Sequence, residues 1–376
     1  MATFLEILST FSDNQNVRGH QFESLCKWIL ETDPIYTNKL KKVWMWDDWP
    51  GRWGVDAGID LIAEDKEGKV WAIQSKCYRE ENSVSKKDID SFISESSNDL
   101  IDCRLLIATT DRIAKNASNV IRRAPDDKPI QQLLLTELLE KQLDWPESLD
   151  DLSSAGPRER FGPRPHQENA IEDVIHGFKK HDRGQMIMAC GTGKTLTGLW
   201  VAEEMESETV LVLFPSLLLL SKTLGDWLRH SKEPFSYLPV CSDSSVIKSS
   251  DDAINLTTSD LSFPSTTDKT EIARFLKGRG RKVIFSTYQS SPQIAAAYES
   301  AKELKPLNLI ICDEAHRCAG KAEAHYTTVL DNEQIPAFKR LFMTATPKVF
   351  KPHIMKMAEE SGVEISSMDD AEKFGP

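Results

Sequence analysis

The stretch Met186-Ile-Met-Ala-Cys-Gly-Thr-Gly-Lys194-Thr195 decides the fold of the second half of this chain. It places a glycine-rich turn between an apolar run and a helical run. Gly191 and Gly193 let backbone N–H groups turn toward phosphate oxygens, and Lys194 adds a positive charge at the β- and γ-phosphates. Thr195 can hold Mg²⁺ from the first turn of the following helix. The stretch therefore predicts a nucleoside triphosphate site.

A second motif, Asp313-Glu314-Ala-His316, follows the apolar run Leu309–Cys312. We interpret this run as a buried parallel strand whose carboxyl end presents both acidic residues at the edge where open α/β sheets bind ligands. Asp313 would hold Mg²⁺ through its water shell, and Glu314 would orient and deprotonate the attacking water. An isolated Asp-Glu pair is most often a solvated turn. Its position after a phosphate loop favours an ATPase.

Length and composition set limits on the class of protein. A chain of 376 residues with 40% hydrophobic residues predicts two globular domains. No apolar run approaches the roughly 18 residues of a membrane span, and the start lacks the basic segment of a secretion signal, so we expect a cytoplasmic protein without a membrane partner. Seven cysteines without C-x-x-C spacing favour reduced thiols. The net charge of −12 still allows a local basic groove for DNA.

The chain divides at a segment rich in Pro, Gly, Ser and charged residues, which we expect to be a linker. The expected parts are an α/β domain at 1–146, the linker at 147–165, an α/β domain at 166–350 and a connector at 351–376. In the second domain, helical segments such as Leu196–Met205 alternate with short apolar runs, which predicts a parallel sheet. Those runs are Gln185–Ala189, Thr209–Phe214, Lys282–Ser286, Leu309–Cys312 and Arg340–Thr344. A polar stretch at Ser242–Thr270 is expected to be an insertion.

In the first domain, Phe4–Phe11 and Gln21–Thr32 are expected to be helices. The expected strands are Ile59–Ala63 and Val70–Gln74, paired across a turn, and the buried strand Arg104–Thr109.

Three polar residues of the paired strands suit metal-dependent cleavage of a phosphodiester. Asp60 begins one strand, while Gln74 and Lys76, two residues apart, face the same side of the next. Asp60 and the carbonyl oxygen of Gln74 suit Mg²⁺, and Lys76 can hold the attacking water and offset developing charge. Taken alone, such residues are more often a solvated face.

Four tryptophans at positions 44, 46, 49 and 53 precede this site. They could stack on bases, but their spacing favours a packed core.

The order of these elements resembles the Mrr-type branch of PD-(D/E)xK nucleases. The resemblance is carried by Gly58-Ile-Asp60, by Gln74-Ser-Lys76, by Phe22-Glu23 on a preceding helix and by the Leu-Leu-Ile-Ala-Thr-Thr strand that follows. In that branch, Gln commonly replaces the Glu of the E-x-K element. The resemblance implies that Asp60, Gln74 and Lys76 are catalytic. It leaves Glu23 either lining the metal site or forming a surface charge on its helix.

The second domain resembles the first motor domain of superfamily two helicases, which commonly lack the first glycine of the phosphate loop, replaced here by Met188. The implied nucleotide site comprises Arg164, Gln167, Gly191, Thr192, Gly193, Lys194, Thr195, Asp313 and His316, with Gln167 bonding the adenine edge. Ser216 and Thr287 lie in motifs that contact a DNA strand in that family. Thr344 and Thr346 match the motif that couples the ATP state to the grip on DNA.

An Mrr-like nuclease followed by this motor resembles the N-terminal part of single-chain type ISP restriction-modification enzymes. The resemblance implies ATP and Mg²⁺ as cofactors, duplex DNA as partner, and translocation coupled to cleavage. It places a second motor domain and an S-adenosylmethionine-dependent methyltransferase beyond these residues. We expect this chain alone to be monomeric and the longer enzyme to pair on DNA. The alternatives are the motor subunit of a type I system or another nuclease-helicase of phage defence, and an ATP-gated DNA-binding module whose nuclease fold no longer cuts.

This resemblance generates a prediction for the chain itself. Phosphoryl transfer is commonly accelerated about 10³- to 10⁵-fold by an arginine finger, which in superfamily two comes from the second motor domain. The chain should therefore bind Mg-nucleotide but hydrolyse ATP near the background rate, with little stimulation by duplex DNA. Steady-state hydrolysis with and without DNA checks this, and robust DNA-stimulated turnover would contradict it.

Overall fold

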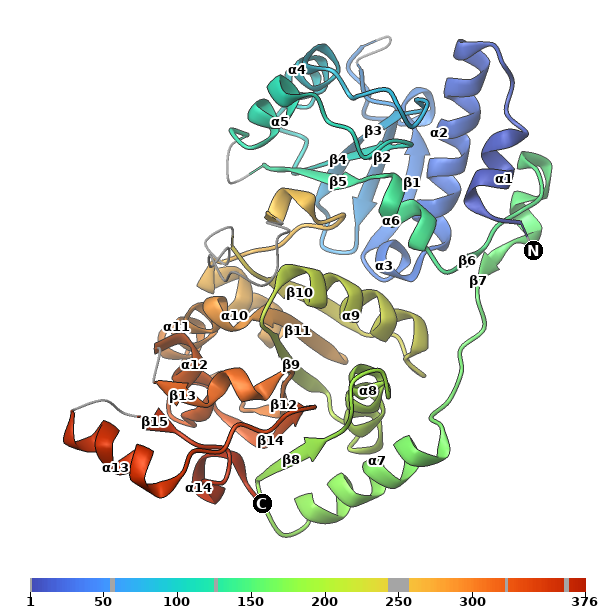
Figure 1. Cartoon of the computed structure of the whole chain (residues 1–376). Helices are drawn as coiled ribbons and strands as arrows, with labels where there is room; N and C mark the ends of the chain where they lie inside the picture. The colour runs from blue at the N-terminus through green and yellow to red at the C-terminus, as the bar shows by residue number, and fades with distance from the viewer. Residues whose placement is uncertain (1, 55–57, 125–127, 243–256, 322–323, 362–364) are drawn as a thin grey trace. The chain divides into compact units, whose positions relative to one another are not determined.

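The computed structural model describes residues 2–54, 58–124, 128–242, 257–321, 324–361 and 365–376 (Figure 1). The chain forms two compact units, and the boundary between them at Glu159 lies inside the expected linker. Unit 1 comprises Met1–Glu159 and Thr258–Pro264, and unit 2 comprises Arg160–Thr257 and Ser265–Pro376. The return of 258–264 to unit 1 is not expected from the sequence. Most of the polar stretch around it, at 243–256, lies outside the described residues.

Unit 1 is built on a five-stranded mixed sheet of order β1-β2-β3-β4-β5. The pairs β1–β2 and β2–β3 are antiparallel, and β3–β4 and β4–β5 are parallel. The strands are β1 (Leu40–Met45), β2 (Leu61–Asp65), β3 (Val70–Lys76), β4 (Cys103–Ala108) and β5 (Ile130–Leu133). The helices are α1 (Phe4–Ser9), α2 (Gln15–Thr32), α3 (Pro34–Thr37), α4 (Lys86–Glu95), α5 (Lys115–Ile121) and α6 (Leu135–Glu140). The short elements are η1 (Trp46–Asp48), β6 (Leu143–Asp144), η2 (Leu149–Ser154), β7 (Gly156–Pro157) and η4 (Thr258–Asp260).

Local hydrogen bonds fix the hairpin and the long helix of unit 1. The Asp65 carboxylate accepts the backbone N–H groups of Glu67 and Lys69, each at 2.9 Å, and this closes the turn between β2 and β3. The expected pairing of these strands is confirmed. Helix α2 begins at Gln15, earlier than expected, because the Asn14 side chain accepts two N–H groups of its first turn.

The tryptophan cluster packs against the core of unit 1. Trp46 is buried, and Trp44, Trp49 and Trp53 are partly buried against the same cluster of apolar side chains. The ring centroids of Trp46 and Trp53 lie 5.0 Å apart at nearly right angles, a favourable edge-to-face contact. This packing confirms the interpretation of the cluster as core.

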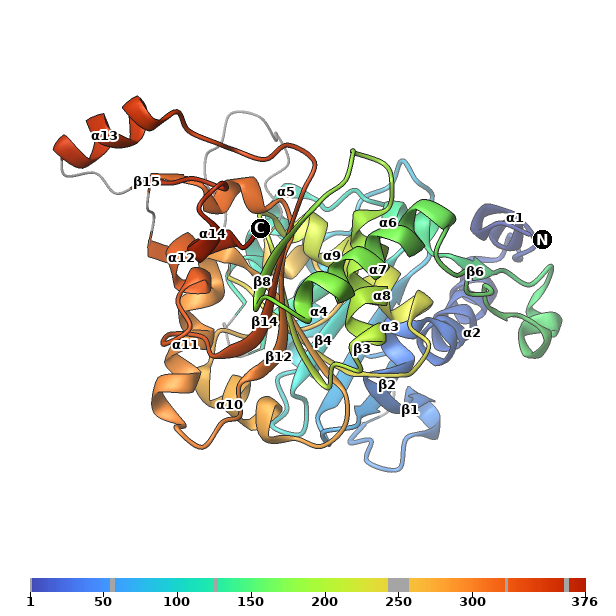
Figure 2. The same ribbon diagram turned by 90° about the horizontal axis from the view of Figure 1, so that it is seen from below.

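Unit 2 contains a six-stranded parallel sheet of order β10-β11-β9-β12-β14-β8. Its strands are β8 (Arg183–Ile187), β9 (Thr209–Phe214), β10 (Ser236–Val240), β11 (Lys282–Thr287), β12 (Leu307–Cys312) and β14 (Ala337–Thr344). Seen along the sheet, α7 (Pro165–Phe178), α8 (Lys194–Glu204) and α9 (Leu217–His230) cover one face (Figure 2). The other face carries α10 (Lys269–Lys277), α11 (Ser291–Ser300) and α12 (Ala324–Thr327). The remaining elements are η5 (Tyr288–Ser290), η6 (Ala315–Cys318), β13 (Gly320–Lys321), η7 (Thr328–Leu330), α13 (Pro352–Glu360), β15 (Ile365–Ser366) and α14 (Ala371–Phe374).

All five expected apolar runs are strands of this sheet, and the expected α/β class is confirmed. The sixth strand, β10, escaped sequence analysis because it is short and contains Pro239, which a central strand does not tolerate. The structure places it at an edge, where a missing N–H group costs little.

The last residues fold back onto the opposite edge strand, β8. The Gln185 side chain donates to the carbonyl oxygens of Met368 and Gly375 at 2.8 and 3.0 Å, and Arg183 donates to Lys373 O at 2.7 Å. A Cβ atom at position 375 would lie 2.3 Å from the Arg183 backbone, so the close approach requires glycine. Residues 365–376, expected to be part of a connector, thus pack against the sheet of unit 2.

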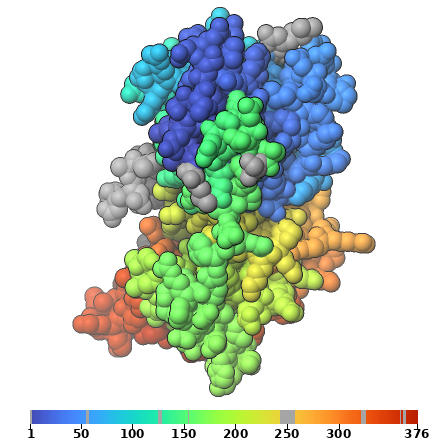
Figure 3. Space-filling model, turned by 90° about the vertical axis from the view of Figure 1, so that its right-hand side faces the viewer, coloured from blue at the N-terminus to red at the C-terminus, as the bar shows by residue number. Residues whose placement is uncertain are grey.

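Helix α7 lies on the surface of unit 2, in green in Figure 3. Among the residues that the structure describes, no helix has the length and apolar character needed to cross a membrane.

Candidate active sites

The glycine-rich turn connects β8 to α8, as the sequence predicts. Gly191 and Gly193 adopt the positive φ angles of +77° and +85°, which side chains other than glycine rarely tolerate. Lys194 is buried, and its Nζ lies 3.4 Å from the carbonyl oxygen of Met188 across the loop. The Thr192 hydroxyl donates to Ala189 O at 2.7 Å. The loop is therefore closed on itself around the lysine, with its amides at the N-terminus of a helix.

Gln167 holds this loop from the start of α7. Its side-chain nitrogen donates to the carbonyl oxygens of Thr192 at 3.1 Å and Gly193 at 3.4 Å, and its oxygen accepts the N–H group of Arg164 at 2.8 Å. His166 Nε2 also lies 3.1 Å from Thr192 O. The Gln167 carboxamide is thus engaged within the protein at both ends, and it positions the phosphate loop. To form the predicted hydrogen bond to adenine, the Gln167 carboxamide would have to give up one of these hydrogen bonds.

Asp313 lies at the carboxyl end of β12, two strands away from β8 in the sheet. Its Oδ1 accepts the N–H group of Glu314 at 2.9 Å, and its own N–H group donates to Leu213 O at 2.9 Å. Burial raises the pKa of Asp313 to about 6, an effect that the positive charge of Lys194 partly offsets. A buried carboxylate of this kind, close to a lysine, is suited to a cation.

Glu314 and His316 connect this acidic motif to β14. Glu314 has a left-handed backbone with φ of +48°, and its carboxylate lies 3.3 Å from His316 Nδ1. His316 Nδ1 lies 3.0 Å from the hydroxyl of Thr344, and Thr346 N donates to the same hydroxyl at 3.2 Å. The structure therefore brings the predicted coupling residues into contact with the predicted ATP site.

The two predicted DNA-contacting residues differ. Ser216 is half-buried and caps α9, with its hydroxyl accepting Leu219 N at 3.4 Å. Thr287 is fully buried, and its hydroxyl donates to Ser290 at 3.2 Å, because η5 covers the end of β11. As placed, the Thr287 side chain cannot reach DNA.

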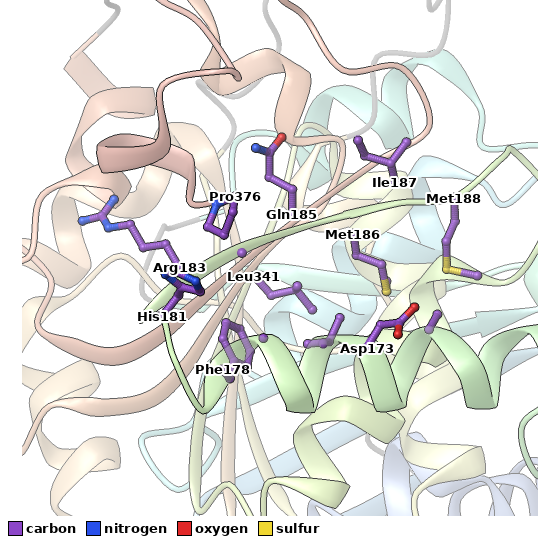
Figure 4. Close-up of a pocket in the computed structure, with 14 residues that line it drawn as sticks. Asp173, Phe178, His181, Arg183, Gln185, Met186, Ile187, Met188, Leu341 and Pro376 are labelled. Carbon is purple, nitrogen blue, oxygen red and sulfur yellow. The ribbon is translucent and has the colours of Figure 1, made fainter.

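A pocket of about 230 Å³ opens between α7 and the edge strand β8 (Figure 4). Phe178, Met186 and Leu341 supply apolar walls, and Asp173 and Arg183 supply charge. Neither Lys194 nor Asp313 lines it, so this hollow is separate from the phosphate loop.

In unit 1, Asp60 precedes β2 beside the end of β3. Its Oδ2 accepts both the backbone N–H group of Ser75 at 2.6 Å and the Ser75 hydroxyl at 3.0 Å. Burial raises the pKa of Asp60, and the hydrogen bond from Ser75 and the charge of Lys76 oppose this shift. Two donors on Oδ2 fix the orientation of the Asp60 carboxylate and leave Oδ1 to accept a further ligand.

Gln74 supplies a second oxygen. Its side-chain nitrogen donates to Gly58 O at 2.8 Å, which orients the amide, and its buried Oε1 has no hydrogen-bond partner among the described residues. A buried acceptor without a partner normally marks a missing ligand or water. Together with Asp60, this oxygen matches the hard donors that Mg²⁺ prefers.

Lys76 and Glu23 complete the group. The charges of both act on Asp60, with opposite effects on its pKa. Glu23 is 18% exposed on α2 and bonds His20 Nδ1 at 2.9 Å. Both Lys76 and Glu23 thus lie close enough to Asp60 for their charges to act on its carboxylate. No cluster of three or more His, Cys, Asp and Glu side chains suited to a metal occurs in the described part of the chain, so any metal here would rest on a mixed set of oxygen donors.

Sequence analysis missed two residues that support these sites. Ser75 lies between two predicted catalytic residues, and only the pairing of β2 with β3 shows that it bonds Asp60. Trp227, on α9, donates its indole N–H to the carbonyl oxygen of Thr195 at 2.9 Å and so holds the first turn of α8. No local sequence signal marks either contact.

Comparison with known families identifies both domains. Residues 31–154 match a family described as restriction endonuclease, of the Mrr type. Residues 160–349, half of the chain, match the family described as type III restriction enzyme, res subunit. The chain belongs to the type III restriction enzyme res subunit family. This res-family chain therefore carries a restriction endonuclease domain followed by a helicase-like ATPase domain, which are domains of enzymes that act on DNA.

One solved structure supports the same architecture over the whole chain. The ATP-dependent type ISP restriction-modification enzyme LlaBIII bound to DNA is 31% identical and covers the whole chain with a TM-score of 0.79. A nuclease-deletion mutant of the type ISP enzyme LlaGI, in complex with a DNA substrate mimic, is 32% identical over 57% of the chain, with a TM-score of 0.42. The predicted resemblance to type ISP enzymes is confirmed.

A viral protein is also similar to the res-family chain. The probable helicase A859L of African swine fever virus is 30% identical over 203 residues, which is 53% of this chain. The chain spans 24% of LlaBIII, 19% of LlaGI and 21% of the viral protein.

The raised pKa of Asp313 predicts a pH-dependent gain in stability for Asp313→Asn. Ionising this carboxyl is harder in the folded motor than in the unfolded chain, so its contribution to stability is lost as pH rises from about 4 to 6. Asparagine does not ionise and can keep the bond from Glu314. At pH 8 the substitution should therefore raise the free energy of unfolding by as much as about 3 kcal/mol, and near pH 4 by much less.

Urea unfolding at both pH values, monitored by hydrogen exchange of the β12 amides, measures this gain. Asp182→Asn is the control, because Lys339 lowers the pKa of that exposed carboxyl and the substitution should give no gain at pH 8. Equal gains for Asp313→Asn at both pH values would contradict the assignment.

Proposed function

We propose that the chain is the nuclease and first motor part of an ATP-dependent DNA restriction enzyme, which cuts the phosphodiester backbone and moves along duplex DNA. The observation that carries the proposal is the pair of prepared cation sites, one in each unit. In one, the charge of Lys194 acts on the buried Asp313. In the other, Asp60 lies opposite Gln74, whose side-chain oxygen has no partner among the described residues. The similarity to a DNA-bound type ISP enzyme over the whole chain supports DNA as the substrate.

In the motor, the loop Gly191–Gly193 would cradle the phosphates of ATP with its amides, and Lys194 would turn from Met188 toward them. Thr195 and Asp313 would hold Mg²⁺, which would neutralise negative charge on the phosphates. Glu314 would take the proton of the attacking water. His316 would pass the state of the site to Thr344 through the hydrogen bond that joins them.

In the nuclease, Asp60 and Gln74 would hold Mg²⁺, which supplies Lewis-acid stabilisation of the phosphate. Lys76 would position the attacking water and offset the negative charge that develops on the phosphodiester. Ser75 keeps Asp60 in place, and Glu23 lies on the neighbouring helix, where it would either join the metal site or bind His20. Metal-dependent nicking of supercoiled plasmid tests this assignment, and its absence would favour a DNA-binding module without cutting.

We predict that Lys194→Ala weakens nucleotide binding by about 10- to 100-fold, because a hydrogen bond to a charged group contributes roughly 1.5 to 3 kcal/mol. A titration with a fluorescent ATP analogue and Mg²⁺ measures the change. Lys180→Ala, which removes an exposed lysine after α7, is the control and should bind as the wild type does. Wild-type affinity in Lys194→Ala would contradict the motor site. Basal plasmid nicking should remain, because unit 1 holds the nuclease residues.

We predict the reverse pattern for Asp60→Ala and Lys76→Ala. Each should lower Mg²⁺-dependent nicking by about 10²-fold or more, since metal binding or water activation is lost, while the affinity for nucleotide stays unchanged. Asp99→Ala removes an exposed carboxylate of unit 1 and should nick normally. Wild-type cleavage by both Asp60→Ala and Lys76→Ala would leave the nuclease without its proposed site.

A further inference from the structure

Residues 258–264 are far in sequence from the nuclease fold but form part of its core. They belong to unit 1, whereas the chain on both sides of them belongs to unit 2. Phe263 is fully buried and Leu261 is 2% exposed. The chain therefore passes between the units three times, and the nuclease fold includes a piece supplied from within the motor sequence.

Backbone and side-chain hydrogen bonds join this segment to the edge strand β5, beside which η4 lies in Figure 1. Gln132 N donates to Leu261 O at 3.1 Å, and the Gln132 side chain donates to Ser259 O at 3.0 Å. The nitrogen of the Gln131 carboxamide, turned toward the segment, lies 2.9 to 3.1 Å from three of its carbonyl oxygens, among which its two N–H groups are shared. Both glutamines are buried, so the segment satisfies amides that would otherwise lack partners.

A second set of contacts joins the segment to α6 and α3. The Ser262 hydroxyl donates to Glu137 at 2.5 Å, and the Tyr36 hydroxyl donates to Ser262 O at 3.1 Å. Glu137 also lies 3.4 Å from the buried ammonium of Lys141, which bonds Asp33 at 2.7 Å. Because buried charges need complete sets of partners, withdrawal of the segment would leave this network incomplete.

The motor fold holds the segment at its C-terminal side. Thr266 N donates to Pro239 O at 3.0 Å, and Thr266 pairs with Val240 at the end of β10. Asp268 then caps α10, accepting Thr270 N at 2.8 Å. A folded motor therefore keeps the segment near its binding surface, whereas an unfolded motor would leave it on a long flexible chain with a lower effective concentration.

We propose that residues 258–264 are a coupling segment, through which the state of the motor fold sets the stability of the nuclease fold. The nuclease keeps its β5–α6 surface covered only while the segment is held in place. A change that loosens the motor should weaken the nuclease, and a ligand that tightens the motor should strengthen it. The expected effect of a ligand rests on the proposed nucleotide site, whereas the expected effect of loosening the motor does not.

Tryptophan fluorescence reports mainly on the nuclease, because seven of the nine tryptophans precede Glu159 (positions 28, 44, 46, 49, 53, 71 and 145), whereas Trp200 and Trp227 lie in unit 2. In the whole chain, Leu309→Ala opens a cavity in the central strand β12 of the motor, where Leu309 is fully buried. We expect it to lower the fluorescence melting midpoint by at least about 2 °C. When combined with Phe263→Ala, the same substitution should lower the midpoint by less than half as much.

Two further variants complete the experiment. Phe92→Ala removes an equally buried ring of the nuclease core away from the segment, and the effect of Leu309→Ala should persist in it. Gln132→Ala replaces Phe263→Ala if the latter does not fold. An unchanged effect of Leu309→Ala in the segment variant, or no effect in the otherwise native chain, would overturn the proposal.

Mg-nucleotide provides an independent measurement. It should raise the fluorescence midpoint of the native chain, and raise it less in Phe263→Ala. If a fluorescent nucleotide fails to bind, the proposed motor site is wrong, and the response to Leu309→Ala still decides the coupling.

Discussion

The parallel pairing of β12, β14 and β8 is the constraint on which the helicase-like ATPase domain depends. Parallel strands carry their carboxyl ends to the same edge of a sheet. The phosphate loop after β8, Thr344 at the end of β14 and Asp313 after β12 therefore meet at one edge. The strand between them carries Thr344, whose hydroxyl contacts His316. The contact between the acidic motif and Thr344 is thus built from neighbouring strand ends.

The positions of the phosphate loop and the acidic motif in the fold could be predicted from the sequence because each motif is local. Each motif follows an apolar strand, and strand alternation fixes the edge at which the motifs lie. The predictions were weaker where function depends on partners remote in sequence. Gln167 was expected to read a base, but the structure commits its amide to the phosphate loop. Thr287 was expected at the DNA surface, but η5 covers it, a tertiary effect that its motif cannot reveal.

In the nuclease, too, the local spacing of residues could be predicted, but contacts between strands could not. The two-residue spacing of Gln74 and Lys76 predicts a shared face, and the hairpin places Asp60 beside them. The sequence cannot show that Ser75 fixes one carboxylate oxygen of Asp60. Nor can it show that the side-chain oxygen of Gln74 has no hydrogen-bond partner among the described residues. These details require the register of β2 against β3. The membership of 258–264 in unit 1 is less predictable still, because Gln131 and Gln132 form an ordinary polar pair in sequence and gain their meaning only from buried carbonyl groups more than a hundred residues later.

The divided nuclease fold also limits how such genes can evolve by exchange of parts. A recombination event at the linker near Glu159 would transfer the nuclease strands without the turn that buries Phe263. The recipient would inherit a nuclease fold with an uncovered apolar surface and glutamine amides that lack partners, unless the corresponding segment of its own motor could cover that surface. Nuclease and motor sequences should therefore be inherited together, and compensating changes should link β5 to the insertion before α10 across related genes.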